Sequence, residues 1–129
     1  MLVIDASAAV DLVAFSSRTR ALQQLVRSER LFAPHLMYSE ALSALRRMER
    51  GLHLTRSEAQ ASVSRLRDMP VRTVWTLDLL DAAWLRRDWL QITDALYVGA
   101  AQRLGAPLLT TDRRLGRAVA DRSIEVITI

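Results

Sequence analysis

The feature that most constrains this chain is a junction, present near each end, at which a short apolar strand runs directly into an aspartate. Leu2-Val3-Ile4 precede Asp5, and Leu108-Leu109-Thr110-Thr111 precede Asp112. A carboxylate just past a buried strand does not serve the core, because an ionised group is costly to bury. If the two strands are neighbours in a parallel sheet, both acids emerge at its carboxyl edge, where open α/β sheets bind ligands. The junctions therefore indicate the start of a metal site.

Strand and helix patterns alternate along the whole chain. This order predicts an α/β fold with a mainly parallel sheet covered by helices on both faces, in one domain spanning residues 1–129. Besides the strand at 2–4, we predict strands at 31–33, 72–75, 108–110 and 124–129, and helices after Asp5 and at 17–28, 36–50, 56–69, 77–88, 94–104 and 113–120. Thr55 and Glu58 form a capping box, Gly51 and Gly105 follow helix ends, and Thr76 and Thr93 are placed to cap the helices that follow them.

Composition excludes several kinds of site. The chain has 129 residues, enough for one core, and no cysteine, so disulfides, thiolate zinc sites and cysteine nucleophiles are excluded. A reducing cytoplasm suits such a chain. No stretch reaches the roughly 18 apolar residues that a membrane span needs. We therefore expect a soluble cytoplasmic protein with no membrane association.

The charge balance is basic. The formal net charge is +4, and all 18 basic residues are arginine. The planar guanidinium matches phosphate oxygens, so the composition is compatible with a nucleic-acid partner. A GC-rich genome, which favours arginine codons, explains the arginine excess as a whole better than a nucleic-acid partner does. The charge thus permits a nucleic-acid partner without requiring one.

Two further acids do not fit ordinary packing. Glu40 lies beside an apolar stripe of the helix at 36–50, where an unpaired carboxylate is costly, so we expect a cationic group to compensate it. Asp94 heads a helix that is apolar on nearly every face, which indicates that its amino end points into the fold or a cleft. Each has a simpler explanation: Glu40 can reach water at the stripe edge, and Asp94 can stabilise its own helix.

Small hydroxyl residues flank the strand-end acids. Ser7 follows Asp5, and Thr110 precedes Asp112. Hydroxyls can hydrogen-bond a carboxylate and orient it toward a metal ion. Helix capping explains a single acid after a strand equally well. These signals carry weight only when several of them agree.

Taken together, the motifs resemble those of the PIN-domain ribonucleases, and more closely the VapC-type toxins of type II toxin–antitoxin pairs. The resemblance covers the whole chain in length and motif order, and rests on Asp5-Ala-Ser, Ser-Glu40-Ala-Leu, Asp94-Ala-Leu-Tyr-Val and Thr110-Thr-Asp112-Arg-Arg-Leu. It implies a three-layer α/β/α sandwich around a five-stranded, mainly parallel sheet. It also implies one catalytic, metal-binding cluster of Asp5, Glu40, Asp94 and Asp112, supported by Ser7 and Thr110.

The chemistry explains why acids are needed in such a cluster. Converging carboxylates repel one another unless they take up protons or bind a cation, and oxygen ligands suit Mg²⁺ or Mn²⁺. Such an ion can activate water and stabilise the leaving oxygen of a phosphodiester. We expect metal-dependent RNA hydrolysis, with the three aspartates as ligands and Glu40 as a ligand or a base.

The resemblance and the remaining residues suggest partners. Arg113 and Arg114 follow Asp112 and are candidates for contact with RNA phosphates, although two exposed arginines on a first helical turn explain them as well. Trp75, Trp84 and Trp89 favour a core or a subunit face over base stacking. The resemblance implies a homodimer and a cognate protein antitoxin that covers the acidic cleft.

Rival functions are weaker or lack motifs. A haloacid-dehalogenase-type phosphatase needs a second aspartate where this chain has Ser7, and it needs a catalytic lysine. A signalling receiver domain also needs a lysine, and the chain has none. A non-catalytic module that binds RNA or a protein partner remains the alternative.

Overall fold

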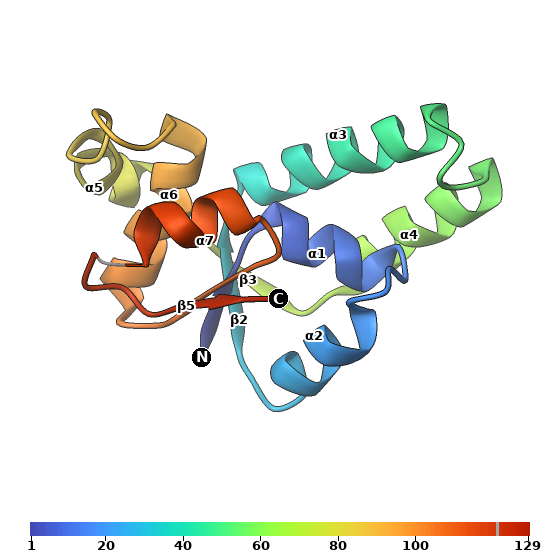
Figure 1. Cartoon of the computed structure of the whole chain (residues 1–129), viewed down its shortest axis with the longest axis horizontal. Coiled ribbons are helices and arrows are strands. Elements are labelled where there is room, and N and C mark those ends of the chain that lie inside the picture. The colour runs from blue at the N-terminus through green and yellow to red at the C-terminus, as the bar shows by residue number, and fades with distance from the viewer. Residues whose placement is uncertain (121) are drawn as a thin grey trace.

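The computed structural model describes residues 1–120 and 122–129, and its centre is a parallel sheet of five strands in the order β3-β2-β1-β4-β5. Every neighbouring pair of strands is parallel. The sheet confirms the predicted fold class (Figure 1). The strands are β1 (Leu2–Ile4), β2 (Leu31–Pro34), β3 (Val71–Val74), β4 (Leu108–Thr110) and β5 (Val126–Thr128).

Helices form the outer two layers. Right-handed crossovers place the helices before β3 on one face of the sheet and those after β3 on the other. Accordingly α1 packs against α2, α3 and α4, whereas α5 packs on α6 and α6 covers β1 and β2. The α-helices are α1 (Ala6–Val13), α2 (Thr19–Val26), α3 (Leu36–Arg50), α4 (Arg56–Asp68), α5 (Leu80–Trp84), α6 (Ile92–Leu104) and α7 (Arg113–Val119). Within the described residues, no helix is both long and apolar enough to cross a bilayer.

The core lies around the two central strands, β1 and β4. Val3, Ile4, Leu108 and Leu109 are completely buried, as expected for strands covered on both faces. The helix α6 is buried from Ala95 to Ala101 without interruption, which confirms that it is packed on more than one side. From β1 the chain continues to β2 and β3 on one side, and it then returns to form β4 and β5 on the other side of β1. The strand order therefore reverses between β1 and β4, which is the topological switch point of the sheet.

Several predicted boundaries hold and one helix does not. The helix α3 spans the predicted residues, and the capping box of Thr55 and Glu58 opens α4. A continuous helix at 77–88 is wrong: a 3-10 turn, η1 (Thr76–Leu79), is followed by the five-residue α5. Arg86 donates a hydrogen bond to the carbonyl of Ala82, and so takes an acceptor that a longer helix would use.

The remaining differences are smaller. Neither Thr76 nor Thr93 caps a helix as predicted. Trp75 occupies the cap position of η1 and Gln91 that of α6, and neither side chain makes a cap hydrogen bond. The strand predicted at 124–129 is confined to Val126–Thr128. Gly105 ends α6 in the left-handed conformation, with φ of 57°, as its sequence position indicates.

Candidate active site

Two of the predicted acids stand side by side at the carboxyl edge of the sheet. Ile4 of β1 pairs with Leu109 of β4, so the aspartates that follow these strands emerge next to each other at the switch point. A cavity of about 280 Å³ opens there. All four predicted acids line it, together with Ala6, Ser7, Ala44, Arg47, Gln91, Thr93, Tyr97 and Arg114.

Asp5 is the most buried acid of the cavity, with 4% of its surface exposed. Its Oδ1 accepts hydrogen bonds from the Ser7 hydroxyl at 2.7 Å and from the Ala8 amide at 2.9 Å, and its Oδ2 accepts one from the Thr110 hydroxyl at 2.5 Å. Burial raises the pKa of Asp5; these three bonds oppose the rise, and the nearby charge of Asp112 adds to it. Asp5 therefore caps α1 and faces the cavity at once.

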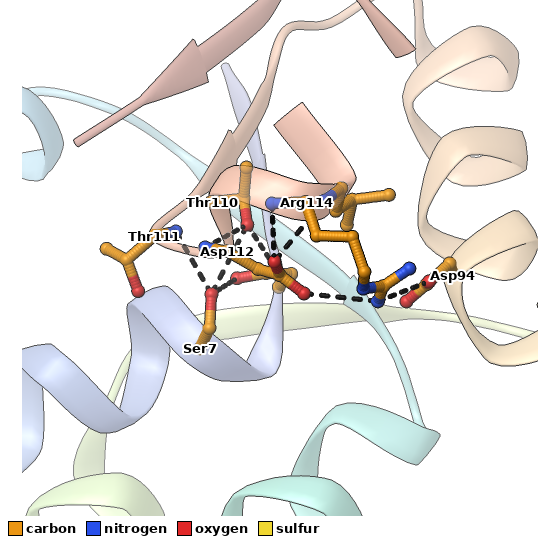
Figure 2. A network of polar contacts seen from close by, with 8 residues as sticks. Ser7, Asp94, Thr110, Thr111, Asp112 and Arg114 are labelled. Carbon is orange, nitrogen blue, oxygen red and sulfur yellow. Dashed lines mark hydrogen bonds and ion pairs between the residues drawn. The ribbon is translucent and has the colours of Figure 1, made fainter. Parts of the chain in front are cut away.

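The hydroxyls of Ser7 and Thr110 join the two central strand ends (Figure 2). Ser7 Oγ accepts a hydrogen bond from the Thr111 amide at 3.0 Å, and Thr110 Oγ1 accepts one from the Asp112 amide at 3.0 Å. The two hydroxyl oxygens lie 3.3 Å apart. Each hydroxyl thus donates to Asp5 and accepts from the segment after β4, the supporting position predicted for both residues.

Arg114 bridges the other two aspartates (Figure 2). Its Nη2 lies 2.9 Å from Asp94 Oδ2 and 3.1 Å from Asp112 Oδ2. The hydrogen bond to Asp94 is the main reason that the pKa of Arg114 is raised. Asp112 also caps α7 through the amides of Arg114 and Leu115. Arg113 is exposed and does not line the cavity.

Glu40 is compensated by a neutral donor. The hydroxyl of Tyr97, on α6, donates a hydrogen bond of 2.6 Å to Glu40 Oε1, on α3. No ion pair to Glu40 forms among the described residues, so no protein side chain supplies the cationic partner expected from the sequence. Burial and the bond to Glu40 raise the pKa of Tyr97, which keeps its hydroxyl protonated as a donor.

The carboxylate oxygens of the cavity suit a hard divalent cation. Every side-chain acceptor that the four acids bring to the cavity is a carboxylate oxygen, the ligand type that Mg²⁺ and Mn²⁺ prefer. Among residues 1–120 and 122–129, no group of three acids or histidines stands close enough to hold one ion. Arg114 places a positive charge between Asp94 and Asp112.

Sequence reasoning missed two cavity residues that carry chemistry. Tyr97 is buried, with 2% of its surface exposed, yet its hydroxyl reaches Glu40. Its position three residues after Asp94, on the same helix face, was the available signal. Arg47 stands seven residues after Glu40, two turns along one face of α3, and also lines the cavity.

Comparison with known proteins decides the family. A family model described as "PIN domain" matches residues 2–120. The chain belongs to the PIN-domain family. Within this family it is similar to "Ribonuclease VapC3" of Mycobacterium tuberculosis, with 46% identity over 90% of this chain and 85% of the relative. It is also 35% identical to "VapC ribonuclease Mb0985" of Mycobacterium bovis, over 89% of this chain and 88% of that protein.

Solved structures share the PIN fold. The VapC20 toxin of Mycobacterium tuberculosis, described as a sarcin-ricin-loop-cleaving toxin, matches with a TM-score of 0.67 and 20% identity, over 92% of this chain and 95% of that one. A toxin–antitoxin complex from Klebsiella pneumoniae matches with a TM-score of 0.68 and 19% identity, over 99% and 97% of the two chains. At these identities the likeness establishes the arrangement of strands and helices.

The contact between Tyr97 and Glu40 can be tested by removing one hydroxyl. Tyr97→Phe keeps the buried ring and is expected to lower the free energy of unfolding by about 1–2 kcal/mol, because a hydrogen bond to a carboxylate is lost. Urea denaturation measures the change, and the effect should vanish in a Glu40→Ala background.

Tyr38→Phe is the matched control, since the Tyr38 hydroxyl makes no hydrogen bond to a described residue. Equal losses in Tyr97→Phe and Tyr38→Phe, or an undiminished loss without Glu40, would contradict the contact.

Proposed function

We propose that this PIN-domain protein is a metal-dependent endoribonuclease that acts as the toxin of a toxin–antitoxin pair. The observation that carries the proposal is the lining of one cavity by Asp5, Glu40, Asp94 and Asp112 at the switch point of the sheet. The ribonuclease names of relatives that match most of the chain support the same activity.

The four acids have separate tasks in this proposal. Asp5, Asp94 and Asp112 would hold Mg²⁺ or Mn²⁺, which when bound lowers the pKa of a water and stabilises the leaving oxygen of a phosphodiester. Ser7 and Thr110 fix the orientation of the Asp5 carboxylate. Tyr97 holds one oxygen of Glu40, and its other oxygen is available as a ligand or to orient the attacking water.

Two arginines at or near the cavity would bind the negatively charged phosphates of the substrate. Arg114 lies over Asp94 and Asp112 and is itself half exposed, so it stands where a negatively charged phosphate enters. Arg113 precedes it on the exposed first turn of α7. We assign both to contact with the RNA backbone, with Arg114 in the cavity and Arg113 outside it.

We also propose two protein partners in the cytoplasm. A protein antitoxin is supported by the solved toxin–antitoxin complex that shares this fold, and it would block the substrate by covering the acid cavity.

A second copy of the chain is supported by an apolar surface on η1 and α5. Leu77 is 79% exposed, Trp84 63% and Leu85 73%, so of the two positions predicted for Trp84, core or subunit face, its exposure favours the subunit face. An isologous dimer would cover this patch on both copies.

Ribonuclease activity is tested by metal-dependent cleavage of labelled RNA. The protein should cut RNA with Mg²⁺ or Mn²⁺ and lose cleavage in EDTA. Asp5→Asn or Asp94→Asn should reduce cleavage at least about a hundredfold, because each removes a carboxylate needed for the cation. Asp88→Asn, which makes the same change at an exposed acid outside the cavity, should cleave as the wild type does.

Binding of many RNAs without metal-dependent cleavage would replace the nuclease with the non-catalytic module. Full activity of a well-folded Asp94→Asn protein would remove that residue from the site. Cleavage that survives EDTA in the wild type would overturn the metal requirement.

Self-association is tested by sedimentation of the isolated protein. The wild type is expected to sediment as a dimer, and Leu77→Glu as a monomer, because the charge is placed on the apolar patch. Leu52→Glu, at a residue 90% exposed in the turn between α3 and α4, should leave the dimer intact. A wild type that stays monomeric at high concentration would contradict the dimer and leave the patch for the antitoxin.

A further inference from the structure

A second, smaller hollow adjoins the acid cavity along α3. It has a volume of about 210 Å³ and is lined by Ser39, Glu40, Ser43 and Arg47. Glu40 and Arg47 line both the hollow and the acid cavity. The two depressions are therefore adjacent, and a chain-like ligand that occupies the cavity could extend towards the hollow.

The hollow follows a row of hydrogen-bond donors on the helix surface. Ser39, Ser43 and Arg47 are spaced four residues apart, so they lie above one another on one face of α3. All three side chains are exposed. The row presents two hydroxyls and one guanidinium, a set that suits an anion carrying several acceptor oxygens.

Arg47 differs from the other arginine of the cavity in its charge balance. Arg114 is held by Asp94 and Asp112, whereas Arg47 makes no ion pair with any residue in the part of the chain that the structure describes. The nearest acid of the hollow, Glu40, already accepts a hydrogen bond from Tyr97 at Oε1. Arg47 thus has donors available for a ligand from solution.

We propose that Arg47, with Ser39 and Ser43, forms a subsite for an RNA phosphate adjacent to the one that is cleaved. The inference rests on the proposed ribonuclease activity, and it adds the path that the RNA strand takes along α3. An RNA strand carries a phosphate at every nucleotide. When one phosphate lies at the four acids, the adjacent phosphate can therefore contact the Arg47 guanidinium, which lines both depressions. Guanidinium and hydroxyl donors match phosphate oxygens in charge and geometry.

The subsite recognises backbone and not sequence. A contact of this kind contributes to affinity for any RNA strand and weakens as salt increases, because counterions are released when the phosphate is neutralised. It also offsets the repulsion between the substrate and the four carboxylates next to it. Arg47 is expected to affect substrate affinity more than the rate of the chemical step.

The neighbouring Arg46 provides a matched control. It belongs to the same helix and is also exposed, but it lies in a different hollow, between α3 and α4, with Glu49 and Arg56. Arg46→Ala and Arg47→Ala remove the same charge and the same side chain. A difference between them therefore reports a local contact and not the change in net charge.

The experiment measures binding of a short labelled RNA of random sequence to both variants in an Asp5→Asn background, which prevents cleavage. Arg47→Ala is expected to weaken binding about five- to tenfold and to reduce the slope of log K against log salt by about 0.7, the value of one phosphate on a single strand. Arg46→Ala should change both quantities far less. With the cleaving wild type as parent, Arg47→Ala should raise KM and leave kcat within about twofold.

The outcomes separate this inference from the activity on which it rests. If the wild type cleaves RNA but Arg47→Ala binds it as Arg46→Ala does, the subsite is wrong and the nuclease stands. A loss confined to kcat, with unchanged binding, also overturns the subsite. If the wild type cleaves no RNA with Mg²⁺ or Mn²⁺, the proposed function fails first. Thermal unfolding of both variants checks that each is folded.

Discussion

The hydrogen bonds that hold the buried carboxylate of Asp5 are the interaction on which the rest of the site depends. Asp5 ends β1, caps α1 and receives the Thr110 hydroxyl from β4, so one side chain connects three elements at the switch point of the sheet. Burial disfavours its ionised form, and the Ser7, Thr110 and Ala8 donors offset part of that cost. The same bonds fix its direction, and Ser7 and Thr110 extend this order to the segment that carries Asp112.

Charge balance explains the rest of the cavity. Four acids share one small volume and have three kinds of partner: hydroxyls for Asp5, a phenol for Glu40, and the shared Arg114 guanidinium for Asp94 and Asp112. Arg114 offers one positive charge at the point where an activating cation is proposed. A divalent ion would compete with it for the same oxygens, so substrate, ion and arginine are coupled through the two aspartates.

Local sequence signals predicted the parts of the structure that local chemistry determines. The capping box at Thr55, the end of α6 at Gly105 and the strand-to-acid junctions at Asp5 and Asp112 each depend on a few adjacent residues. The partner of Glu40 could not be predicted, because Tyr97 lies 57 residues away in the sequence and meets Glu40 only through the tertiary fold. The end of the helix near Trp84 was missed for the same reason. The Arg86 side chain donates hydrogen bonds to the Ala82 carbonyl and to Gln102 of α6, and the second of these partners is distant in the sequence. Family resemblance proposed the four-acid set, and packing then placed the four residues around one cavity.

The central claim is that this cavity binds a divalent cation through its aspartates. An anomalous difference map from crystals soaked in Mn²⁺ locates such an ion directly. We predict a peak within about 2.5 Å of carboxylate oxygens of at least two of Asp5, Asp94 and Asp112, with the Arg114 guanidinium displaced from between Asp94 and Asp112. An empty cavity at saturating Mn²⁺, with Arg114 still bridging the two aspartates, would contradict the claim.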